Sequence, residues 1–221
     1  MPPDVELYLV RHAESEANLA HRFANGVEGY PLTARGRHQA AGLAARLADA
    51  LRGRAITSLH TSPVLRARQT AATVSALLDT PLQAPDPALA EFDVGVFEGT
   101  DDEQNWQAFD RLMRAWLIDQ DPDRRIDGGE SLLDMQARFA PFIHGLIAAS
   151  APGDRHVLVT HGGLLRCMVP QIAVNVDGRF THDRSLDNPA WVLIRTHGDD
   201  LVCHSWGDEL CARDWAPPAG A

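Results

Sequence analysis

Near its start, the chain places an arginine and a histidine directly after an apolar segment. Residues 7–10 are apolar, Arg11 and His12 follow them, and polar residues typical of a helix start come next. This pattern predicts a buried strand that delivers both side chains to its carboxyl end, the edge where open α/β sheets bind ligands. A neutral imidazole is a usable nucleophile near pH 7, and an adjacent guanidinium can hold a phosphate by two parallel hydrogen bonds. The pair therefore suits transfer of a phosphoryl group to a histidine nitrogen.

A second histidine follows a second apolar segment. Residues 156–160 predict another buried strand, His161 ends it, and Gly162 leads into a helix predicted over 164–172. If the two strands are neighbours in a parallel sheet, His12 and His161 come together at one edge of that sheet. The alternation of predicted strands and helices along the chain supports such an arrangement.

Arg66 is a candidate ligand for the same anion. Residues 55–61 predict a strand, Ser62 a helix N-cap and Pro63 the first helical residue, which places Arg66 in the first helical turn. Helix N-termini present free backbone donors and the positive end of the helix dipole to anions. We therefore expect Arg66 to be a second phosphate ligand.

Carboxylates are concentrated between residues 89 and 99. Glu91, Asp93 and Glu98 lie there among apolar residues and glycines. Burial in such a setting raises the pKa of a carboxyl group and allows it to act as a general acid. The alternative is a loop whose acids are solvated.

Composition limits the classes of function. The 221 residues carry a formal net charge of −10, which argues against broad nucleic-acid binding and against attachment to anionic membranes. No stretch approaches transmembrane length, and the first residues lack the pattern of a secretory signal. The odd number of cysteines and the absence of zinc-like spacing favour reduced thiols and a cytoplasmic location, although Cys203 and Cys211 could pair.

Several short motifs occur in a fixed order over most of the chain. They are Leu9-Val10-Arg11-His12-Ala13-Glu14-Ser15 with Asn18, Pro31-Leu32-Thr33 with Gly36, Ser62-Pro63 with Arg66 and Gln69, Glu91 with Phe97-Glu98-Gly99, Gly128-Gly129-Glu130-Ser131, and Thr160-His161-Gly162. Together these motifs resemble the histidine phosphatase superfamily, which includes cofactor-dependent phosphoglycerate mutases and many small phosphomonoesterases.

The resemblance implies a role for each matched residue. His12 attacks phosphorus and becomes a phosphohistidine, while Glu91 protonates the leaving oxygen and later takes a proton from water. The phosphate-binding residues that it implies are Arg11, Asn18, Arg66, His161 and Gly162. It implies no cofactor and no metal.

The same resemblance implies a three-layer α/β/α sandwich with a mostly parallel central sheet. The chain also predicts helices over residues 14–20 and 101–120, after Thr33, and from about 131 to 149. Residues 191–196 and 201–205 predict an antiparallel hairpin. We expect a single domain over residues 1–221 with a small helical cap inserted at about 100–127.

The motifs favour a phosphatase over a mutase. A mutase needs extra cationic ligands and a site closed to water, whereas the insertion at about 100–127 is short, and Gly128-Gly129-Glu130-Ser131 resembles the phosphatase branch. The first hypothesis is hydrolysis of a small phosphomonoester, and phosphoglycerate mutase activity is the alternative. A catalytically silent module that binds a phosphorylated ligand or a protein is the second alternative, since fold does not dictate function.

The identity of the substrate depends on the predicted cap. The residues expected to set specificity are Trp106, Phe109, Arg111 and Arg114. An apolar lid favours bulky or aromatic esters, and inward arginines favour acidic sugars or glycerates. The expected partner is a small phosphorylated substrate, with no nucleic acid and no membrane. The protein is expected to be a monomer or a homodimer, because the final hairpin can leave an edge available for pairing.

Overall fold

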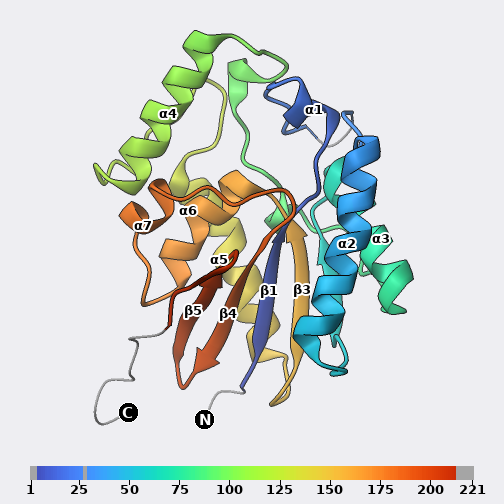
Figure 1. Cartoon of the computed structure of the whole chain (residues 1–221). Helices are drawn as coiled ribbons and strands as arrows, with labels where there is room; N and C mark the ends of the chain where they lie inside the picture. The colour runs from blue at the N-terminus through green and yellow to red at the C-terminus, as the bar shows by residue number, and fades with distance from the viewer. Residues whose placement is uncertain (1–3, 27–28, 213–221) are drawn as a thin grey trace.

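In the computed structural model, which describes residues 4–26 and 29–212, six strands form one mixed sheet in the order β2-β3-β1-β4-β5-β6 (Figure 1). The strands are β1 (Glu6–Arg11), β2 (Ser58–Thr61), β3 (Arg155–Thr160), β4 (Trp191–His197), β5 (Asp200–Trp206) and β6 (Glu209–Leu210). The helices are α1 (Glu16–Leu19), α2 (Ala34–Leu51), α3 (Leu65–Leu78), α4 (Glu103–Leu117), α5 (Leu132–Ala148), α6 (Gly162–Ile172) and α7 (Gly178–His182), with 3₁₀ turns η1 (Pro87–Leu89) and η2 (Gly95–Phe97). Helices cover both faces of the sheet, which confirms the α/β sandwich.

The strands that carry the two histidines are parallel neighbours. Arg11 at the end of β1 pairs with Thr160 at the end of β3, and the His12 N–H donates to the Thr160 carbonyl at 3.0 Å. β2 lies parallel to β3 on its other side. His12 and His161 therefore leave the sheet side by side at one edge, as their positions after apolar segments predicted.

The other half of the sheet is antiparallel. β4 pairs antiparallel with β1, and β4 and β5 form the hairpin that the sequence predicted. A short turn joins β4 to β5, and such a turn can only return the chain in the opposite direction. The sheet is therefore mixed and not mostly parallel as expected: it is parallel where the histidines follow and antiparallel beyond β1. β1 is hydrogen-bonded along both of its edges.

Alternate residues of β1 enter two different cores. Tyr8 and Val10 pack against α2 and α3, whereas Leu7 and Leu9 face the core formed with α4, α5 and α6. Leucines that recur every four residues form the buried face of α2: Leu43, Leu47 and Leu51. The central strand is thus enclosed on both faces, which fixes the position of the residues that follow it.

The start of α3 differs from the prediction. Val64 is the N-cap and Leu65 the first helical residue, so Pro63 precedes the helix and Ser62 does not cap it. The Ser62 hydroxyl accepts a hydrogen bond from the Val64 N–H at 3.2 Å and contacts the His161 ring at 2.7 Å. The serine thus contacts His161 and does not cap the helix, while Arg66 still lies in the first turn.

The predicted cap region contains α4, which lies beyond the carboxyl ends of β1 and β3 (Figure 1). It is shorter at both ends than the predicted range of 101–120. The five-residue helix α7 was not predicted, because so short a segment shows little periodicity. In the described part of the chain, no helix is long and apolar enough to cross a membrane. The assignment of a single domain with a cap inserted at about 100–127 stays a prediction.

Candidate active site

Two hydrogen bonds fix the tautomer of His12. Its Nδ1 lies 2.7 Å from the Ala13 carbonyl oxygen, which can only accept, and its Nε2 lies 2.9 Å from Arg66 Nε, which can only donate. The ring is therefore neutral, with its proton on Nδ1 and its lone pair on Nε2. Only 3% of the residue is exposed. Burial, and then the charges of Arg66 and Arg11, hold the pKa of His12 well below its ordinary value of 6.5.

His161 contacts a second nitrogen of Arg66. Arg66 Nη2 lies 3.3 Å from His161 Nδ1, which must accept, so His161 Nε2 donates to the Ser62 hydroxyl at 2.7 Å. The rings of His12 and His161 meet edge to face with centroids 5.1 Å apart. Burial, with the neighbouring cations, also lowers the pKa of His161 well below 6.5. Arg66 thus contacts two neutral imidazoles through different nitrogens.

Arg11 has unused capacity to bind an anion. One of its terminal nitrogens donates to the Leu186 carbonyl. Its Nε is buried and, within the described part of the chain, has no hydrogen-bond partner. Burial lowers the pKa of Arg11, and it lowers the pKa of Arg66 to about 10. A phosphate oxygen would supply the acceptor and the negative charge that these guanidinium groups lack.

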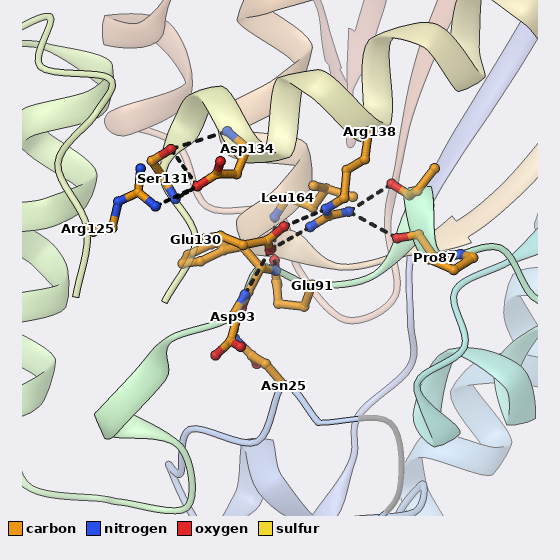
Figure 2. Close-up of polar contacts among 12 residues, drawn as sticks. Asn25, Pro87, Glu91, Asp93, Arg125, Glu130, Ser131, Asp134, Arg138 and Leu164 are labelled. Carbon is orange, nitrogen blue, oxygen red and sulfur yellow. Dashed lines mark hydrogen bonds and ion pairs between the residues drawn. The ribbon is translucent and has the colours of Figure 1, made fainter. Parts of the chain in front are cut away.

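The carboxyl group of Glu91 lies at the N-terminus of α6 (Figure 2). Its two oxygens accept hydrogen bonds from the Gly163 N–H at 3.0 Å and from the Leu164 N–H at 2.7 Å. Desolvation by burial outweighs these bonds and the charge of Arg66, and it raises the pKa of Glu91 above its ordinary value of 4.5. A carboxyl group in this state can hold a proton for donation.

Gly163 allows Glu91 to approach α6. A Cβ atom at this position would lie 2.8 Å from Glu91 Oε1 and 2.8 Å from Phe92 Cε1. The Phe92 ring has no free space, since only 1% of that residue is exposed. We therefore expect Gly163→Ala to destabilise the protein by about 1–3 kcal/mol through overpacking.

Denaturant unfolding of Gly163→Ala against Gly145→Ala tests this expectation. Gly145 lies inside α5, and a Cβ atom there would meet nothing within 4 Å. Alanine at position 145 should stabilise the helix by up to about 1 kcal/mol. Equal unfolding midpoints for the two variants would contradict the close packing of Gly163 against Glu91.

A cavity of about 190 Å³ joins these side chains. Its polar end is formed by Arg11, His12, Arg66, Glu91 and Gly162, and its aromatic end by Phe23, Phe92, Trp106 and Phe109. Phe23 and Trp106 stack with ring centroids 3.9 Å apart. Among the described residues that line it, Glu91 is the one carboxylate and there are four arginines. The cavity is therefore suited to an anion that carries an organic group.

The structure brings most of the predicted site residues to this cavity. Asn18 lines it, with its Oδ1 accepting from the Ser15 N–H at 3.0 Å. His161 is completely buried and lies behind Arg66, outside the residues that line the cavity. Arg111 and Arg114 are exposed and do not line it, and Arg114 pairs with Asp119 at 3.4 Å.

Further lining residues were absent from the prediction. They are Ala17, Arg22, Phe23, Ala24, Asn25, Phe92, Gly163, Arg166, Ser185 and Leu186. Arg166 could have been found, because it follows Gly162 by four residues on the same helix and so lies on the same face. The others come mainly from irregular loops, whose paths no periodic pattern predicts.

Comparison with known proteins agrees with this arrangement. The family model of the histidine phosphatase superfamily (branch 1) matches residues 7–209. The chain is 33% identical over 177 residues to a protein of Escherichia fergusonii named "probable phosphoglycerate mutase GpmB". The alignment covers 76% of this chain and 74% of the relative.

Solved structures share the fold. A mycobacterial glucosyl-3-phosphoglycerate phosphatase is similar with a TM-score of 0.74 at 25% identity, covering 91% of this chain and 98% of that one. An alpha-ribazole phosphatase from Shigella flexneri is similar with a TM-score of 0.70 at 23% identity, covering 93% and 97%. With the family model matched over nearly the whole described chain, this protein belongs to the histidine phosphatase superfamily.

Proposed function

We propose that this protein is a metal-independent phosphomonoesterase that acts on a small phosphorylated metabolite through a phosphohistidine on His12. The observation that carries the proposal is the neutral His12 ring, whose lone pair on Nε2 faces a buried guanidinium. A nucleophilic nitrogen beside uncompensated cations fits the attack on an electron-rich phosphoryl group.

The proposed reaction has two steps. His12 Nε2 forms a bond to phosphorus while the bond from phosphorus to the ester oxygen breaks, and Glu91 gives that oxygen its proton. Water then attacks the phosphohistidine, Glu91 takes a proton from the water, and inorganic phosphate leaves with His12 restored. Arg11 and Arg66 neutralise the charge on the phosphoryl oxygens in both steps, and His161 holds Arg66 in place.

Phosphoglycerate mutase activity is the second candidate. Relatives named as probable mutases support it, as do Arg22 and Arg166, which line the same cavity and could hold a carboxylate. The similarity to a glucosyl-3-phosphoglycerate phosphatase supports hydrolysis instead. We propose hydrolysis first, because an aromatic cluster of Phe23, Phe92, Trp106 and Phe109 lines the cavity beside the phosphate-binding residues, and Arg22 already pairs with Asp101 at 2.6 Å.

Assays with defined substrates decide between these functions. We expect the protein to release p-nitrophenol from p-nitrophenyl phosphate in the presence of EDTA at mildly acidic to neutral pH. Isomerisation of 3-phosphoglycerate with added 2,3-bisphosphoglycerate would support the mutase. Failure to turn over any member of a phosphoester panel would contradict both and favour a silent binding module. The same panel identifies the leaving group that the aromatic wall accepts.

Location and assembly are proposals of the same kind. All three cysteines are free thiols, which supports a cytoplasmic location. A monomer or a homodimer is proposed, with no nucleic-acid or membrane partner, in keeping with the net charge of −10.

A further inference from the structure

The segment that carries Glu91 is irregular and is held by side chains from another part of the chain. It consists of η1, the residues around Glu91, and Asp93, and it forms no strand. Glu91 lines both the cavity at His12 and a separate cavity of about 410 Å³ that also includes Glu130 and Arg138. Because a cavity rather than a packed core lies on that side of Glu91, its position depends on specific contacts.

Glu130 and Arg138 form a two-pronged ion pair next to this segment. Arg138 Nε lies 2.9 Å from Glu130 Oε1, and Arg138 Nη2 lies 3.0 Å from Glu130 Oε2. Both side chains are about three-quarters buried, with 21% and 25% of their surface exposed. A bidentate pair in this setting has a defined geometry as well as charge.

The ion pair binds the backbone on both sides of Glu91 (Figure 2). Before Glu91, Arg138 Nη1 donates to the carbonyls of Pro87 at 3.2 Å and Ala88 at 2.9 Å. After Glu91, Glu130 Oε2 accepts from the Asp93 N–H at 3.0 Å, and the Glu130 N–H donates to the Asp93 carbonyl at 3.0 Å. One ion pair thus bridges the two ends of the segment that presents the carboxyl group.

Gly129 permits the close backbone approach that these bonds need. A Cβ atom on Gly129 would lie 2.6 Å from the Asp93 carbonyl oxygen and 3.1 Å from the Gly95 nitrogen. The Gly128-Gly129-Glu130-Ser131 motif therefore combines a residue small enough for the contact with the carboxylate that makes it.

We propose that Glu130 and Arg138 are positioning residues for the proton donor Glu91. The proposal rests on the proposed function, in which Glu91 protonates the leaving oxygen. Neither side chain lines the cavity at His12, so their effect on chemistry passes through the position of Glu91. Loosening the ion pair should therefore impair proton donation and leave the phosphate end intact.

Arg138→Gln and Arg125→Gln form a matched test. Arg125 pairs with Asp134, near the start of the same helix, at 3.0 Å, and within the described part of the chain it makes no hydrogen bond or ion pair with residues 87–93 (Figure 2). For Arg138→Gln we expect the ratio of kcat for phenyl phosphate to kcat for p-nitrophenyl phosphate to fall about tenfold, because general acid catalysis matters most for the poorer leaving group. Arg125→Gln should keep the ratio of the unaltered protein. Equal losses on both esters in Arg138→Gln would indicate a merely structural role and overturn the proposal.

Amide hydrogen exchange supplies a measurement that does not depend on activity. The N–H groups of Gly163 and Leu164 donate to the Glu91 carboxyl group, so their exchange should quicken in Arg138→Gln and not in Arg125→Gln. Unchanged exchange in both variants would overturn the positioning role even if the unaltered protein is a phosphatase. If the unaltered protein hydrolysed neither ester, the proposed function would fail, while faster exchange would still support the positioning of Glu91. If Arg138→Gln does not fold, Glu130→Gln takes its place in both measurements.

Discussion

Replacing His12 by alanine is expected to reduce phosphatase activity by at least about 10⁴-fold, because removal of a nucleophile leaves only binding and electrostatic contributions to the rate. Arg66 Nε now donates to His12 Nε2 at 2.9 Å, and in His12→Ala this donor becomes available to a phosphate oxygen. Phosphate binding itself should therefore persist. The measurement is the rate of p-nitrophenyl phosphate hydrolysis at saturating substrate. His38→Ala, an exposed histidine of α2, serves as the control and should keep full activity.

Trapping of the intermediate tests the same assignment directly. After rapid quenching without acid, phosphate should be found on His12 and should be absent from His12→Ala. His161 is buried behind Arg66 and uses both ring nitrogens in hydrogen bonds, so it should not be labelled. Phosphate on His161 would reverse the roles of the two histidines.

Replacing Glu91 by glutamine is expected to slow hydrolysis of phenyl phosphate by about 10²–10⁴-fold, the usual contribution of a general acid. The loss on p-nitrophenyl phosphate should be far smaller, because a good leaving group needs little protonation. Glutamine keeps the size of the side chain and one oxygen to accept from α6. Its NH2 group cannot accept from the second N–H of α6, and this lost hydrogen bond should slow both esters alike. The difference between the two losses therefore reports the proton. Equal losses on both esters would argue against Glu91 as the acid.

The other two carboxylates of this region are suitable controls. Asp93 is exposed and accepts from the Gly95 N–H, and Glu98 accepts from the N–H groups of Asn25 and Gly26. Neither lines the cavity at His12. We expect Asp93→Asn and Glu98→Gln to keep the ratio of rates on the two esters.

The pH profile should report the same two groups. Protonation removes the lone pair of His12, and its lowered pKa keeps the ring neutral as pH falls below 6.5. Glu91 must carry a proton to donate it, so activity should decline as pH rises through its pKa, which burial raises above 4.5. A bell-shaped profile with a mildly acidic maximum is expected, and its alkaline limb should be lost in Glu91→Gln. Activity that rises steadily into alkaline pH would contradict the assignment.

Local patterns in the sequence predicted the parts of the site that stand at strand and helix ends. Buried apolar segments precede Arg11, His12 and His161 in the sequence. Because parallel strands all end at the same edge of a sheet, the residues that follow these segments must lie near one another. Arg66 needed only a helix start, and an error of two residues in that start did not move it out of the first turn.

What the sequence did not predict depends on contacts between distant segments. Phe23 lies in an irregular loop and stacks on Trp106, and no sequence pattern at either position predicts this contact. Arg138 reaches carbonyl groups about fifty positions away in sequence, as in its bond to Ala88. Arg114 was expected near the substrate because of its helix, but the rotation of α4 places it in solvent beside Asp119. These contacts depend on how distant segments pack against one another, and neither composition nor periodicity predicts which individual residues will meet.

The proposed nucleophile and the proposed proton donor lie on parts of the fold with different local stability. His12 follows a strand that is hydrogen-bonded along both edges and enclosed by two cores, whereas Glu91 stands on a segment with one 3₁₀ turn and a bridging ion pair. Segments with few backbone hydrogen bonds open at lower free energy than central strands. Under mild heating or low denaturant, the proton donor should thus be lost before the nucleophile. If the protein is the proposed phosphatase, its apparent resistance to inactivation should then depend on the leaving group of the ester used to measure it.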